Sequence, residues 1–192
     1  TDEILFPVSA IVSMVTLMED GQSVESVLAG AETICGAWVA CGMHRAPWRV
    51  VVQSAGRALA IDAATFGARL TDSPVLRQLV LRSAVAGHFL TSQSVGCNRF
   101  HDLTSRAARW LLMVVDRTGS REVRLTQEFL SQMLGAHRPS VTVALGALED
   151  RGLIARRRRG VIDVLDTEAL EAAACECYRK VRDYTARVLD LD

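Results

Sequence analysis

The segment "LTQEFLSQMLGAHRPSVTVALGALEDRGLI", residues 125–154, decides the fold of the C-terminal half of this chain. Thr126 stands where a helix N-cap is expected, and apolar residues at a spacing of three or four follow it as far as Gly135. A second amphipathic stretch includes Pro139, which fits the first turn of a helix, and ends at Gly152. Because only a short glycine-containing turn separates the two stretches, the segment predicts a helix-turn-helix.

The next segment, "LIARRRRGVIDVLD" (residues 153–166), predicts two strands around an Arg-Gly turn. A helix-turn-helix followed by such a hairpin is a winged helix. Residues 121–160 contain eight arginines and four acidic residues, although the net charge of the whole chain is zero. This local excess of positive charge is compatible with phosphate binding, and a solvated charged face is the alternative.

The N-terminal end of the second helix is the part of a recognition helix that enters the major groove of DNA. Arg138 and Thr142 are therefore the expected base-reading residues, since arginine makes two hydrogen bonds to guanine. Polar and basic residues on the first helix, the turn and the wing suit phosphate contacts, with a plain helix cap as the alternative for His137. The expected phosphate contacts are Thr126, Gln127, His137, Ser140, Arg157, Arg158 and Arg159.

The first 62 residues alternate between apolar and polar and predict a small antiparallel β domain. "SAIVSMVTLM" and "SVESVLAG" flank "EDGQ", which contains the Asp-Gly signal of a hairpin. "WRVVVQ" and "RALAID" flank "SAG" and predict a second hairpin, with a short helix and loop between the two hairpins. The chain starts directly in an expected strand, so we expect the front of this domain to be missing.

Near residue 62 the apolar period changes to that of a helix, and Ser73 followed by Pro74 signals a helix start. The helix expected over residues 75–100 would be about 40 Å long. A helix of that length with apolar residues on more than one side is typical of a dimer contact, and packing on its own domain alone is the alternative. The expected dimerisation stripe is Leu76, Leu79, Ser83, Ala86, Leu90, Gln93 and Cys97.

The composition is that of an ordinary globular protein, with 49% apolar and 23% charged residues, and no apolar run has the length of a membrane span. The cysteines are odd in number and no secretory signal is visible, which predicts reduced thiols and a cytoplasmic location. Cys175 and Cys177 are expected on one long final helix that begins after Asp166. There they would point about 200° apart, so no metal site is expected.

With these features in place, the sequence resembles the cyclic-AMP receptor protein/Fnr (Crp/Fnr) family of transcription regulators. The matching stretches are "RAARWLLMVVDRTG", the helix-turn-helix segment and the wing "RRRRGVIDVLD". The resemblance implies an α+β fold with a cupin-like, cyclic-nucleotide-binding-like antiparallel β-roll sensor domain, a long dimerisation helix and a C-terminal winged helix-turn-helix. The implied boundaries are residues 1–70 for an N-terminally incomplete sensor domain, 71–100 for the helix and 101–192 for the DNA-binding domain.

Carried over by position, Arg138 takes the place of the family's guanine-reading arginine. The family's base-reading glutamate is Pro139 here, and a further recognition arginine falls at Val143, so the family's best-known half-site is not assumed. In the sensor, Ala37 stands where cyclic-nucleotide-binding members have glutamate, and Arg45 and Arg49 flank the position of their arginine.

Without that acid, and with the bulk of Trp38 and Trp48 nearby, the resemblance predicts that cyclic AMP does not bind in the usual way. The cysteines do not match the iron–sulfur ligands of Fnr, and no cofactor is expected.

The expected function is that of a homodimeric regulator that binds double-stranded DNA with two-fold symmetry, with RNA polymerase as an optional further partner and the effector unknown. An enzyme is the second class considered. The chain lacks the common nucleophile, phosphate-binding and metalloprotease motifs, so no catalytic residue is expected. The third class is an interaction protein whose sensor docks a partner and whose winged helix no longer binds DNA. The run of four arginines in the wing argues against this class.

Overall fold

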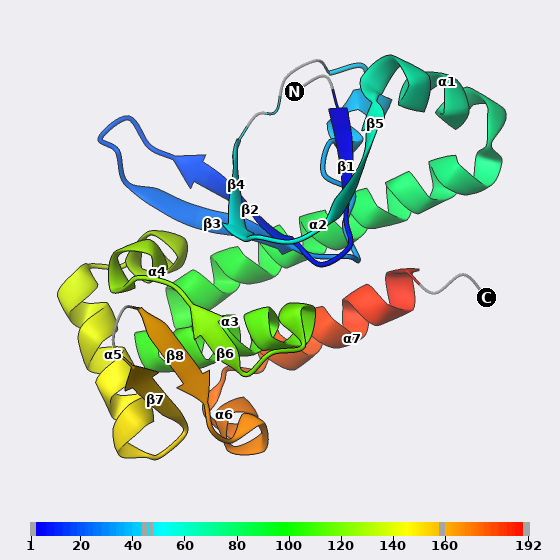
Figure 1. Ribbon diagram of the computed structural model, residues 1–192. Helices are drawn as coiled ribbons and strands as arrows, with labels where there is room; N and C mark the ends of the chain where they lie inside the picture. Colours follow the sequence, from blue (N-terminus) through cyan, green and yellow to red (C-terminus); the bar gives the residue numbers. More distant parts are fainter. Residues whose placement is uncertain (1–2, 44–45, 47, 158–159, 190–192) are drawn as a thin grey trace.

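The computed structural model describes residues 3–43, 46, 48–157 and 160–189. A β domain comes first, a long helix follows it, and a winged helix forms the C-terminal part (Figure 1). The α+β fold class predicted from the sequence is confirmed. No helix in the described part of the chain combines the length and the hydropathy that a bilayer crossing requires.

The β domain consists of two small antiparallel sheets. In one, β1 (Glu3–Pro7) pairs with β5 (Ala58–Asp62). In the other, β2 (Ile11–Leu17) lies between β3 (Ser23–Ala29) and β4 (Arg49–Ser54). The pairing of β2 with β3 confirms the hairpin predicted around the Asp-Gly turn, and a short 3-10 helix, η1 (Ala37–Cys41), lies in the predicted helix-and-loop region.

The second predicted hairpin is wrong, because β4 and β5 pair with different strands. The chain between them passes the bend that joins β1 to β2, where the Arg57 carbonyl accepts a hydrogen bond of 2.8 Å from the Val8 amide. A Cβ on Gly56 would lie 2.4 Å from the backbone nitrogen of Ala10. Gly56 therefore allows two backbone segments to approach each other closely at a bend, and it does not form a tight hairpin turn.

Two helices lead out of the β domain. Asp62 caps α1 (Ala63–Asp72), and Ser73 caps α2 (Pro74–Phe100) through a 3.2 Å hydrogen bond that its hydroxyl accepts from the Leu76 amide. The predicted start signal at Ser73 and Pro74 is confirmed. In Figure 1, α2 crosses the molecule between the β domain and the winged helix.

The winged helix contains the predicted helix-turn-helix and the predicted wing. It also has a third short strand, β6 (Glu122–Arg124), which pairs with β8 (Val161–Val164) of the wing. Since β8 also pairs with β7 (Ile154–Arg157), the sheet order is β6-β8-β7. Asp102 caps its first helix, because its side chain accepts a hydrogen bond from the Ser105 amide. The elements are α3 (Leu103–Thr118), β6 (Glu122–Arg124), α4 (Gln127–Leu134), α5 (Arg138–Asp150), β7 (Ile154–Arg157), β8 (Val161–Val164), α6 (Thr167–Ala173) and α7 (Cys177–Leu189).

One apolar core joins the β domain to the winged helix. It runs from Ile11 and Leu28 in the β strands, through α3, to Leu130 on α4 and Leu145 on α5. The middle of α3, from Arg106 to Val114, is buried without interruption. The β domain and the helix-turn-helix are therefore packed against the same helix.

Polar contacts cross the same junction. The Trp110 indole donates a 2.8 Å hydrogen bond to Glu25 on β3, and Arg117 forms a 2.7 Å ion pair with Glu32. The other oxygen of Glu25, Oε1, is buried without a hydrogen-bond partner among the described residues. Burial raises the pKa of Glu25, against the smaller lowering effects of the Ser13 hydroxyl, Trp110 and nearby arginines.

The turn of the helix-turn-helix touches the β2–β3 hairpin at Gly135. This residue has φ of 56°, in the left-handed region, and ends α4 with a hydrogen bond from the Ala136 amide to the Ser131 carbonyl. A Cβ on Gly135 would lie 3.0 Å from Cγ2 of Val24. Both the conformation and the contact with β3 therefore favour glycine.

Glu25→Gln should flatten the dependence of stability on pH above pH 4.5, which is the ordinary pKa of a glutamate side chain. Because the folded state keeps a proton that the unfolded chain has released, Glu25 makes stability fall as pH rises through this range. Glutamine keeps the acceptor for Trp110 and has no proton to lose. Urea unfolding from pH 5 to pH 8 measures the slope, with Glu19→Gln in the exposed turn as control; an unchanged slope in Glu25→Gln contradicts the assignment.

Gly135→Ala should destabilise the fold by about 1–2 kcal/mol, because alanine must adopt a left-handed conformation and press on Val24. Gly96→Ala is the matched control, since it lies within α2 with no atom within 4 Å of its would-be Cβ. The control should gain up to about 1 kcal/mol through helix propensity. Equal effects of the two substitutions in urea unfolding would show that the turn is not specific for glycine.

Candidate nucleic-acid interface

The helix-turn-helix is positioned by apolar faces and capping residues. The inward face of α5 consists of Val141, Leu145 and Leu148, each with 0% exposure. Thr126 caps α4, because its hydroxyl accepts a 3.0 Å hydrogen bond from the Phe129 amide. The cap, the inward face and the Gly135 turn therefore lie where the sequence predicts.

The outer side of α5 carries the residues expected to read bases. Arg138 is the first residue of the helix, and it is exposed together with Ser140 and Thr142. No carboxylate among the described residues pairs with the Arg138 guanidinium, so its charge faces solvent. Val143, where the family has an arginine, is also exposed.

A hydrogen bond links the two helices of the motif on this outer side. The Thr142 hydroxyl lies 3.0 Å from the side-chain oxygen of Gln127 and 3.1 Å from the Arg138 carbonyl, and can donate to either. Gln127 is thereby oriented by the residue predicted to read bases. His137 occupies the N-cap position of α5 without a side-chain capping bond, so its exposed ring does not take the capping role that the sequence left open.

The wing arginines differ in their contacts. Arg156 is held by Glu149 of α5, which accepts 2.8 Å and 2.7 Å hydrogen bonds from its amide and its Nε. These bonds lower the pKa of Glu149, the side-chain bond most. Arg157 pairs with Asp163 and stays largely exposed, whereas Arg158 and Arg159 lie outside the described residues.

A groove runs between the start of α4, the start of α5 and the wing. Its lining includes Thr126, Gln127, Arg138 and Arg157, which are four of the residues predicted to contact DNA. Cationic and hydrogen-bonding side chains from three elements thus face one concave surface. This arrangement can bind a phosphate backbone beside a row of base edges.

The sensor residues singled out by the sequence lie around η1. Ala37 is the first residue of η1 and packs on the apolar cluster of Ile4, Phe66, Leu70 and Val80. Trp38 and Trp48 meet edge to face, with ring centroids 5.8 Å apart. Arg49 is exposed, and Arg45 lies outside the described residues.

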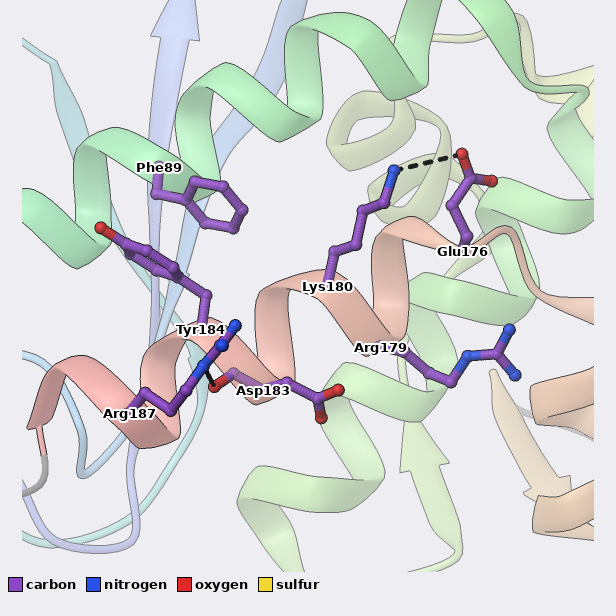
Figure 2. Close-up of a pocket in the computed structure, with 7 residues that line it drawn as sticks. All are labelled: Phe89, Glu176, Arg179, Lys180, Asp183, Tyr184 and Arg187. Atoms are coloured by element: carbon purple, nitrogen blue, oxygen red, sulfur yellow. Dashed lines mark hydrogen bonds and ion pairs between the residues drawn. The ribbon is translucent and has the colours of Figure 1, made fainter.

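Most residues of the stripe predicted for dimerisation are buried by other parts of the same chain. Ser83, Ala86, Leu90 and Cys97 are buried by the chain itself, so at these four positions the prediction is corrected. Leu76, Leu79 and Gln93 are half-buried. Part of the cover is α7, whose Tyr184 stacks on Phe89 of α2 with ring centroids 4.0 Å apart (Figure 2).

A different stripe of α2 faces solvent. It consists of Leu81, Val85, His88, Ser92 and Val95, spaced alternately by four and three residues. We call it the α2 surface stripe. This spacing is that of a coiled-coil seam, and the sequence pattern alone did not separate it from the buried stripe.

The final helix predicted from the sequence is broken. Its two pieces, α6 and α7, are separated at residues 174–176, so Cys175 lies outside a helix and Cys177 opens α7. The prediction that Cys175 and Cys177 lie on one helix and point apart is therefore wrong. Their thiols gather with Cys97 and His101, and all four ligand atoms lie within 4.8 Å of one another.

Residues 105–173 match the family model of the Crp-like helix-turn-helix domain. The CRP-like cAMP-activated global transcriptional regulator of Mycobacterium tuberculosis is 30% identical over 125 residues. The match covers 62% of this chain and 55% of that relative, so the chain spans about half the length of the curated relatives it matches.

Solved structures of regulators share the fold. A CRP family transcriptional regulator from Thermus thermophilus is 20% identical, with a TM-score of 0.73 over 90% of this chain and 88% of that one. A CRP/FNR family regulator from the same organism is 19% identical, with a TM-score of 0.72 over the same shares. The resemblance predicted from the sequence is confirmed: the chain contains a Crp-like helix-turn-helix domain and has the fold of the Crp/Fnr family.

Proposed function

We propose that this chain is a DNA-binding transcription regulator of the Crp/Fnr type that acts in the cytoplasm. The observation that carries the proposal is the groove between α4, α5 and the wing, which is lined by Thr126, Gln127, Arg138 and Arg157. The excess of arginine over acidic residues in this region would bind phosphates, and an unpaired arginine at the start of α5 would read bases.

In this proposal some groove residues read the base sequence, and others hold phosphates and fix the position of the protein on DNA. Arg138 would enter the major groove with the N-terminal end of α5 and bond a guanine, while Thr142 contacts a neighbouring base. Thr126, Gln127, His137, Ser140 and the wing arginines, including Arg158 and Arg159, would hold phosphates and set the register. Pro139 has no side-chain carboxylate to accept a hydrogen bond from a base, so the recognised base pairs should differ from those of members with a glutamate there.

We further propose a homodimer formed through the α2 surface stripe. Three of its members, Leu81, Val85 and Val95, are 60%, 51% and 68% exposed, which is unusual for apolar residues on a helix that is otherwise packed. Pairing of two such stripes would place two recognition helices about 34 Å apart, one turn of DNA. The operator would then have two-fold symmetry.

The β domain is the proposed sensor. Ala37 packs on apolar side chains and has no carboxylate for a ribose hydroxyl, so the domain would not bind cyclic AMP in the usual way. The alternative within the same function is a different signal or a protein partner, with DNA binding that depends on it. The packing of Trp38 on Trp48 beside η1 favours this alternative, because it fills space near the expected nucleotide position.

Selection from a random DNA duplex pool tests the function. The chain should enrich a two-fold symmetric site, and Arg138→Ala should relax the preference at one base pair per half-site by about 1–3 kcal/mol. Arg157→Ala should weaken all sites and lower the salt slope of log K by about 0.9 per lost phosphate contact. Arg179→Ala, an exposed arginine on α7 outside the groove, is the control.

Failure to enrich any site leaves two explanations that a repeat with cell extract separates. Enrichment with extract means that an effector is required. No enrichment in either selection, or equal losses in Arg138→Ala and Arg179→Ala, contradicts DNA reading by α5.

The double substitution Leu81→Glu and Val85→Glu should convert the dimer to a monomer, because it places four like charges in one seam. Sedimentation equilibrium measures the association. Val52→Glu on β4, whose side chain is 64% exposed, is the matched control and should stay dimeric. A double variant that associates like the unchanged chain would move the interface away from the α2 surface stripe.

A further inference from the structure

Four side chains with metal-binding atoms meet where the end of α2 contacts the break between α6 and α7. The sulfurs of Cys97 and Cys175 are 3.5 Å apart, and the sulfur of Cys177 is 3.5 Å from Nδ1 of His101. All four atoms lie within 4.8 Å of one another. These residues, named here the Cys₃His cluster, come from segments more than 70 positions apart in the chain.

The fold brings the cluster together through three local features. Cys97 is in the last turn of α2, and His101 follows as the C-cap residue, four positions later. The Cys175-Glu176-Cys177 segment turns between two helices, which directs both thiols toward α2. The three cysteines are at most 7% exposed, while the His101 side chain is 23% exposed.

We propose that the Cys₃His cluster binds one zinc ion. Three thiolates and one imidazole are a ligand set of structural zinc sites. A tetrahedral zinc ion with sulfur ligands at about 2.3 Å and nitrogen at about 2.0–2.1 Å needs its ligand atoms about 3.5–3.8 Å apart. The two separations of 3.5 Å fall at this value, so small side-chain shifts suffice.

Neighbouring groups orient the ligands through hydrogen bonds, as such groups do in zinc proteins. Nε2 of His101 lies 3.0 Å from the Glu176 carboxylate, which leaves Nδ1 to face the thiols. Gln93 donates a 3.0 Å hydrogen bond to the sulfur of Cys177. Figure 2 shows Glu176 also paired with Lys180 at the start of α7.

The surrounding charge suits an anionic complex. Three thiolates with one zinc ion leave a net charge of minus one, which a buried site must offset. Arg109 on α3 is 6% exposed, and its Nε and Nη1 have no hydrogen-bond partner among the described residues. Its positive charge acts on the thiols of both Cys97 and Cys175 and favours the thiolate form of each, which is the form that binds zinc.

Two other uses of the cluster fit less well. A disulfide between Cys97 and Cys175 would leave the paired arrangement of Cys177, His101 and Glu176 without a role. An iron–sulfur cluster contains several metal atoms and needs more space than four ligand atoms within 4.8 Å enclose. The single tetrahedral ion uses all four ligands together with the groups that orient them.

Cobalt titration tests the proposal, because Co²⁺ substitutes for zinc and absorbs visibly. The whole chain, reduced and freed of metal with a chelator, should take up one Co²⁺ with the strong visible bands of a tetrahedral ion and a thiolate-to-cobalt charge-transfer band. One equivalent of Zn²⁺ should then remove these bands. Zinc in thousandfold excess over its dissociation constant should raise the thermal midpoint by about 10 °C.

Variants assign the ligands. His101→Ala and Cys175→Ser should weaken cobalt binding by more than about 100-fold, Glu176→Gln by roughly 10–100-fold, and His101→Cys should restore it. Cys41→Ser removes an exposed thiol of η1 and is the matched control, which should bind like the unchanged chain. His101→Ala changes a partly exposed residue, so it remains informative even if a buried-cysteine variant does not fold.

Three results would each overturn the proposal. These are absence of the charge-transfer band at saturating Co²⁺, equal binding by His101→Ala and the unchanged chain, and an iron-containing cluster in place of zinc. The zinc site does not depend on DNA binding, so it and the proposed function are tested separately.

Discussion

The close packing of α3 against both halves of the molecule is the constraint on which the rest of the structure depends. Its middle, Arg106–Val114, is buried throughout, so every neighbour must fit its surface. Trp110 bonds to the β domain, while Arg106 donates to the Leu134 carbonyl at the end of α4. A shift of the β domain would therefore change the surroundings of the helix that supports α4 and α5, which gives the proposed sensor a direct path to them.

The contact between Val24 and Gly135 connects the β domain to the helix-turn-helix a second time, without passing through α3. The β2–β3 hairpin touches the turn of the helix-turn-helix, and a pocket between them is lined by hairpin residues 20–23 together with His137 and Arg138. The hairpin thus lies beside the start of the recognition helix. In the proposed mode of binding, DNA over Arg138 would lie beside this hairpin, so the position of the β domain would affect access to the groove.

Sequence reasoning was sufficient wherever one local signal determined the structure. The cap at Thr126, the turn at Gly135 and the wing needed only neighbouring residues, and they lie where predicted. It failed where the structure depends on residues far away in the sequence. β4 and β5 have the sequence pattern of a hairpin, but the chain bends at Gly56, and each strand pairs with a different partner. On α2, two stripes have helical spacing, and the packing of the β domain, α3 and α7 determines which is covered. The break at residues 174–176 has no glycine or proline to signal it.

The same break links the two outer surfaces of α2. Because α7 starts at Cys177, a zinc ion at the Cys₃His cluster would help to set the angle at which α7 lies along α2, with Tyr184 stacked on Phe89. Together with the β domain and α3, α7 covers the buried stripe and leaves Leu81, Val85 and Val95 exposed. Without zinc at the cluster, α7 would be held by apolar packing, a few ion pairs and hydrogen bonds such as that from Tyr178 to Asp116. Displacement of α7 would expose Phe89, and the exposed apolar surface of α2 would then be wider than the α2 surface stripe. A zinc ion at the cluster would therefore help to specify which face of α2 contacts a second chain.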